Sequence, residues 1–177
     1  MAMSEAAGEP AGGEGQSAGL WRFSCAFYAQ PGVSEALIAL QDRAGLDVNL
    51  ILFALWQGAC GLHRLSHAEL MAAERSRRPD QGGNRAAACG RCDAKLRSDR
   101  DADIQRLRER IKTLEIAAER IVQRRLARLA GTPAGDTAPA ARAAAAQANL
   151  ALVLGPKMAG AVEATRIREA LEAFLRG

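Results

Sequence analysis

The stretch Gly45–Gly61, GLDVNLILFALWQGACG, is the most apolar part of this chain of 177 residues and decides its fold. The thirteen residues 50–62 are interrupted only by Gln57 and two glycines, fewer than the roughly 20 that a bilayer span needs. A helix over 48–60 would be about 20 Å long. Because its apolar residues point in every direction, we expect it to be buried on all sides in a helical core.

Polar residues at the start of this stretch raise the question of a site. Asp47 is well placed to cap the helix, whereas Asn49 lies in its first turn. One interpretation is a ligand pocket between the first three helices, formed by Tyr28, Asp42, Asp47, Asn49 and Trp56. The competing one is structural, with Asp47 as a cap, Asn49 bonded to backbone groups and Asp42 exposed. No catalytic set is recognisable, so an enzyme is the less favoured class.

The flanking segments also have helical spacing. Apolar residues at intervals of three and four predict helices over 20–28 and 33–44, the second ending at Gly45. The capping box SHAE at Ser66–Glu69 predicts a helix from His67 to about Arg77, and another is expected over 85–97. No window alternates as a strand does. The sequence thus predicts an all-α, single helical-bundle domain of six to eight helices.

A long basic amphipathic helix is expected from about 101 to 130. Its heptad seam consists of Ile104, Leu107, Ile111, Leu114, Ala118 and Ile121. The seam predicts a helical partner, which is either another helix of this chain or a second protein chain, including a second copy. Residues 72–128 carry 16 Lys and Arg against 9 Asp and Glu. Acidic residues are interleaved and no aromatic residue is near in sequence, so nucleic-acid binding is the weaker alternative.

Composition divides the rest of the chain. We expect a disordered acidic tail over 1–19, a helical domain over 20–130, an alanine-rich linker over 131–149 that turns helical after Pro139, and C-terminal helices over 150–177 that pack on the domain. The start of the chain does not resemble a secretory signal, and four cysteines fit reduced thiols. These features predict a cytoplasmic protein that does not enter a membrane.

Two histidines and two cysteines are candidate metal ligands. His63 and His67 are four residues apart, and with Cys89 and Cys92 they could complete a tetrahedral zinc site. Ser66 starts a new helix between the histidines, however, and the gap to Cys89 matches no standard zinc-finger spacing. We therefore expect no metal and no cofactor.

Two blocks resemble a known family: LWRFSCAFYAQPGV at 20–33 and LQDRAGLDVNLILFALW at 40–56. They are similar to an uncharacterised family of small bacterial, mainly proteobacterial, proteins that is classed as a domain of unknown function. The resemblance is strongest over 21–61 and continues through ERIKTLEIAAER at 109–120. It implies a helical cytoplasmic protein and no particular activity. The function that the sequence favours is a non-catalytic protein-interaction or regulatory module.

Overall fold

The computed structural model describes residues 12–61, 63–77, 101–131 and 138–176. This part of the chain contains helices and no strand, which confirms the predicted all-α class. The helices are α1 (Gly12–Tyr28), α2 (Val33–Ala44), α3 (Val48–Ala59), α4 (His67–Arg77), α6 (Ala102–Ala127), α7 (Pro139–Met158) and α8 (Val162–Arg176). The helix expected over 85–97 lies outside the described residues.

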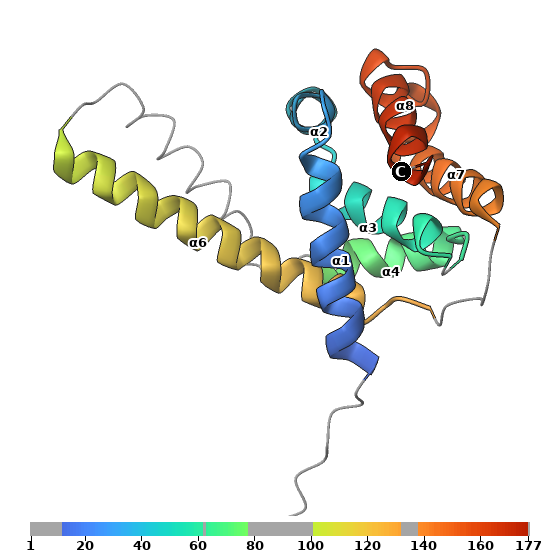
Figure 1. Cartoon of the computed structure of the whole chain (residues 1–177), viewed down its shortest axis with the longest axis horizontal. Helices are drawn as coiled ribbons and strands as arrows, with labels where there is room; N and C mark the ends of the chain where they lie inside the picture. Colours follow the sequence, from blue (N-terminus) through green and yellow to red (C-terminus); the bar gives the residue numbers. More distant parts are fainter. Residues whose placement is uncertain (1–11, 62, 78–100, 132–137, 177) are drawn as a thin grey trace, which may run out of the picture.

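Helix α3 is the centre of the fold (Figure 1). Ten consecutive residues, 50–59, are buried, because α1 and α6 pack against one part of its surface and α7 crosses another. The crossing with α7 is very close. A Cβ atom at Gly58 would lie 2.2 Å from the backbone nitrogen of Ala146, so only glycine permits this approach. The most apolar stretch of the sequence is therefore the core helix, as predicted.

The helix ends follow local sequence rules. The Asp47 carboxylate accepts a hydrogen bond from the backbone N–H of Leu50 at 3.0 Å and caps α3. Glu69 accepts from the Ser66 N–H at 2.7 Å, while the Ser66 hydroxyl accepts from the Glu69 N–H at 3.3 Å. This reciprocal pair is the predicted capping box of α4. Gly45 ends α2 with a φ of 65°, a left-handed conformation that favours glycine.

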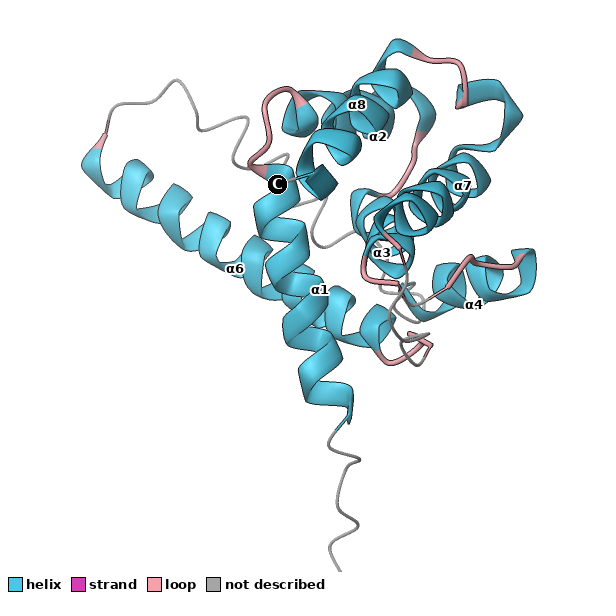
Figure 2. Ribbon diagram, turned by 45° about the vertical axis from the view of Figure 1, so that its right-hand side comes forward, coloured by secondary structure: helices cyan, strands magenta, loops and turns pink. Residues whose placement is uncertain are grey.

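The C-terminal helices pack on the rest of the domain. Helix α7 packs on α3, and α8 packs on α2 and α7 (Figure 2). Phe174 of α8 makes edge-to-face contacts with Phe23 and Phe27 of α1, at centroid distances of 5.6 and 5.7 Å. An exposed ion pair between Arg43 and Glu163 at 2.6 Å joins α2 to α8. The rings contribute more than the ion pair, because exposed pairs stabilise by at most about 1 kcal/mol.

Two boundaries differ from the predicted ones. Helix α1 begins at Gly12, so residues 12–19 are helical and do not belong to a disordered tail. Tertiary contacts account for this: Gly19 faces Trp56, and the Gln16 side chain donates to the Gly131 carbonyl at 3.2 Å. Helix α7 begins at Pro139, where the sequence predicts that the alanine-rich segment turns helical, but residues 139–149 pack on the core and belong to the domain, not to a linker. Leu150 and Ala146 are fully buried against the core.

Within the described residues, helix α6 contacts the body mainly near its C-terminal end. Its fully buried side chains are Leu126 and Ala127, with Gln123 at 4% exposure. From there the helix runs away from the other helices that are described, as both views show (Figures 1 and 2). The outer half of α6 is therefore supported by few contacts within the described part of the chain.

Candidate functional site

Asn49 belongs to a polar junction between α1, α3 and α6. Its side-chain Oδ1 accepts a hydrogen bond from Nε2 of Gln123 on α6 at 3.0 Å. Gln123 is only 4% exposed, and its Oε1 has no hydrogen-bond partner. An unsatisfied buried carbonyl costs free energy, and a water molecule or a bound ion can supply the partner of such a group. Gln123 was not predicted, because it lies 74 residues from Asn49 in the sequence.

The carboxylate of Glu119 lies one helical turn from Gln123. Partial desolvation raises the pKa of Glu119, and the nearby charges of Glu115 and Asp47 raise it further. Desolvation also raises the pKa of Tyr28, helped by the charge of Glu119. The structure thus brings Tyr28, Asp47 and Asn49 close to α6. The junction is rich in hydrogen-bond acceptors and negative charge, which suits a cationic group.

The other two residues of the predicted pocket lie elsewhere. Asp42 is on the exposed surface of α2. Trp56 is 4% exposed, packs against Phe53 at a centroid distance of 6.3 Å and faces Gly19 of α1. Trp56 is therefore a core residue. The predicted pocket lay between the first three helices, whereas the polar junction includes α6 and not α2, because Gln123 of α6 is the side chain that bonds to Asn49 of α3.

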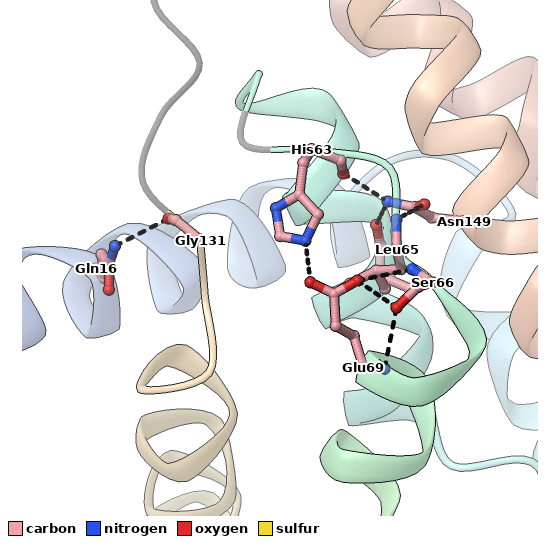
Figure 3. Close-up of polar contacts among 8 residues, drawn as sticks. Gln16, His63, Leu65, Ser66, Glu69, Gly131 and Asn149 are labelled. Atoms are coloured by element: carbon pink, nitrogen blue, oxygen red, sulfur yellow. Dashed lines mark hydrogen bonds and ion pairs between the residues drawn. The ribbon is translucent and has the colours of Figure 1, made fainter.

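A second polar cluster joins the α3–α4 loop to α4 and α7 (Figure 3). His63 Nε2 and Glu69 Oε1 are 2.7 Å apart. The buried side chain of Asn149 accepts from the Leu65 N–H at 2.7 Å and donates to the carbonyls of His63 and Ala54 at 3.2 and 3.0 Å. These bonds satisfy backbone groups that the loop leaves buried, so the cluster fixes the loop in place.

The candidate metal ligands do not form a site in the described part of the chain. His63 is paired with Glu69, and His67 is exposed on α4. Cys89 and Cys92 lie outside the described residues. Across the ranges that the structure describes, no group of three or more His, Cys, Asp or Glu side chains could hold a metal ion.

The heptad seam of α6 exposes large apolar side chains. Leu107, Leu114 and Ile121 are 47%, 63% and 44% exposed, while Ile104 and Ile111 are half-buried. At 100° per residue, Ile121 points about 160° away from buried Gln123 around the helix. The exposed stripe therefore faces away from the helices on which α6 rests. A partner can approach it without meeting the body of the domain.

Several of the basic side chains on α6 already have partners on this helix or beside it. Arg106 pairs with Asp103, and Lys112 with Glu109, each at 3.0 Å. Arg120 lies over the Trp21 ring at 4.7 Å, so an aromatic residue is near the helix after all, although far from it in sequence. Because Arg120 covers one face of the Trp21 ring, that face is not free to stack on a base.

A groove of about 340 Å³ lies between α7 and α8. Its lining consists of three alanines, Pro139, Leu175, Arg176, and Gln147, which donates to Glu172 at 2.8 Å. None of its lining side chains is a nucleophile paired with a base. The groove thus gives no indication of a reaction.

Together these features describe a small all-helical domain whose described residues show no recognisable catalytic set and whose α6 carries an exposed apolar seam. The model of the family described as "Protein of unknown function (DUF2390)" matches residues 19–126, and the chain belongs to this family. This confirms the resemblance to a domain of unknown function. No curated protein and no solved structure matches the chain. None of the described helices is both long enough and apolar enough to span a bilayer.

Proposed function

We propose that the protein is a non-catalytic interaction module in which the α6 seam packs against a second copy of the chain. The observation that carries this proposal is the exposure of Leu107, Leu114 and Ile121 at 44–63% on a helix that extends beyond the body. Seam positions of this kind are buried when two such helices pair. Their direction, away from the described helices of the body, leaves these three side chains accessible to a partner.

The expected affinity follows from the size of the stripe. Completing the burial of a half-exposed Leu or Ile stabilises by about 1 kcal/mol, which gives about 6 kcal/mol for three such residues in each of two chains. Association costs about 4–15 kcal/mol, so the half-buried Ile104 and Ile111 must also contribute. Even if these four side chains of the two chains add about 4 kcal/mol, the lowest association cost leaves about 6 kcal/mol, so we expect a weak dimer with a dissociation constant of roughly tens of micromolar or weaker.

Light scattering after size-exclusion chromatography, over a range of protein concentrations, tests the proposal. The wild type should shift from the mass of a monomer towards that of a dimer, and Leu107→Glu with Leu114→Glu should remain monomeric. Ile116→Glu is the matched control. Ile116 is 51% exposed on the same helix, but at the heptad position farthest from the seam, so this variant should still dimerise.

The contrary outcome has two forms. A wild type that is monomeric at every concentration rejects the proposal, whatever the variants do. If the monomer also unfolds at lower urea concentration after Leu107→Glu but not after Ile116→Glu, another segment of the same chain covers the seam. Circular dichroism of each variant shows whether the helices are retained.

A second candidate function is the binding of a small cationic ligand at the junction of α1, α3 and α6. Specific support comes from the unpartnered Oε1 of buried Gln123, one turn from the carboxylate of Glu119. A primary ammonium group could donate hydrogen bonds to both. Diaminobutane should raise the melting temperature of the wild type. Asn49→Ala should keep the fold and lose this rise, whereas no rise in the wild type rejects the candidate.

A further inference from the structure

The types of residue along the seam indicate how two α6 helices would pair. Ile104 and Ile111 occupy heptad position a, and Leu107 and Leu114 occupy position d. β-Branched residues at a with leucine at d favour two-stranded parallel coiled coils, because each residue type then fits the side-chain packing of its own layer. Ala118 and Ile121 follow as the next a and d residues towards the body.

Charged residues flank these layers at positions g and e. In a parallel pair in register, position g of one helix faces the following e position of the other. Asp103 then faces Arg108, and Arg110 faces Glu115. Both contacts join opposite charges, and the third, between Ala117 and Val122, is apolar. Each contact occurs twice in a symmetric dimer.

The charged contacts alone do not decide whether the two α6 helices are parallel or antiparallel. An antiparallel pair with Ile111 opposite Leu114 also brings Arg108 near Glu115. Its layers, however, pair Leu107 with the small Ala118, Ile111 with Leu114 and Ile104 with Ile121, so neither leucine meets a leucine. The layer composition therefore favours the parallel pair, in which each Ile and Leu meets its own kind.

We infer that the partner of α6 is a second α6 in a parallel, in-register coiled coil over residues 103–122. This inference rests on the proposed function and makes it more specific. The pair places both domain bodies at the same end, beside the C-terminal turns of α6. The body lies on the opposite face of α6 from the seam there, since Ile121 and Leu126 point about 140° apart around the helix. The described helices of the two bodies therefore do not lie between the paired seams.

A charge-exchange series tests the direction. In the parallel pair, Arg110→Glu places two carboxylates opposite each other at both symmetric contacts. We expect the dissociation constant of the dimer to rise about tenfold at low salt. Adding Glu115→Arg restores opposite charges and should bring the constant back to within about threefold of the wild type. In the antiparallel pair Arg110 faces Ala117, and the double variant would instead stay weakened by contact between Arg108 and the new arginine.

Disulfide cross-linking gives an independent reading, in a background with the four native cysteines changed to serine. Leu107→Cys alone should cross-link the parallel dimer, because both residues share one layer. In the antiparallel pair these positions are eleven residues, roughly 16 Å, apart along the axis, beyond the reach of a disulfide. Ile116→Cys is the control, and it should not cross-link in either case.

The outcomes distinguish the proposed dimerisation from the inferred parallel orientation. A dimer that cross-links only from a mixture of Leu107→Cys and Ala118→Cys chains is antiparallel. That result overturns the inference while the proposed function stands. A dimer that forms neither cross-link also overturns the inference, because its interface does not follow the seam in register. A chain that never dimerises removes both claims.

Discussion

The crossing of α3 and α7 predicts a large effect of adding one carbon atom. Gly58→Ala would place a Cβ 2.2 Å from the nitrogen and 2.4 Å from the Cα of Ala146. These are backbone atoms, so no rotamer change can relieve the overlap. Ordinary contact begins at 3.4 Å, which requires α7 to move away by about 1.2 Å.

This movement costs free energy because it separates side chains that are packed between α3 and α7. A gap of 0.5–1 Å loses about a quarter to a half of each dispersion contact, and fully buried Ala54, Leu55 and Leu150 lie along the two helices. Alanine in place of an interior helical glycine gains about 1 kcal/mol. We expect a net loss of about 3 kcal/mol in the free energy of unfolding, near the upper end of the usual range for overpacking.

Urea denaturation followed by circular dichroism measures this loss. Gly15→Ala is the matched control, because Gly15 lies in helix α1 and a Cβ there meets nothing within 4 Å. This control should leave stability unchanged or raise it slightly. A Gly58→Ala variant as stable as the wild type would show that α7 does not cross α3 at this distance, and the account of the core would be wrong.

Three further variants test other parts of the structure. Asn149→Ala leaves the buried Leu65 N–H without its partner and should cost about 2–4 kcal/mol in urea denaturation, whereas Gln147→Ala, at a half-buried position of the same helix, should cost less because its bond to Glu172 is exposed to solvent. Asp47→Ala removes the α3 cap and should cost about 1 kcal/mol by the same assay; no loss would mean that the cap is not formed. Glu119→Gln should stabilise the protein at pH 7, because the fold disfavours the ionised carboxylate. Since the pKa of Glu119 is raised in the folded state, this gain should disappear as the pH falls below its ordinary value near 4.5, and an equal gain at pH 3 would contradict the assignment.

Much of the fold could be predicted because it depends on neighbours in sequence. The spacing of apolar residues gave the helical class, and Asp47, Ser66 with Glu69, and Gly45 marked helix ends through contacts within four residues. The start of α1 could not be predicted this way. Its first turns contain several glycines, which are poor helix formers, and contacts of Gly19 with Trp56 and of Gln16 with Gly131 support them.

The sequence by itself determined which residues are apolar, how they are spaced and therefore which helices form. Only the tertiary structure decided which residues meet: Asn49 with Gln123, Gly58 with Ala146, and Asn149 with the α3–α4 loop. Each of these contacts joins positions more than 70 residues apart. Helical periodicity is a local property and gives the faces of each helix, whereas the choice of neighbour depends on how all the helices pack at once. The heptad seam depends on both, since its spacing is visible in the sequence whereas its exposure is visible only in the fold.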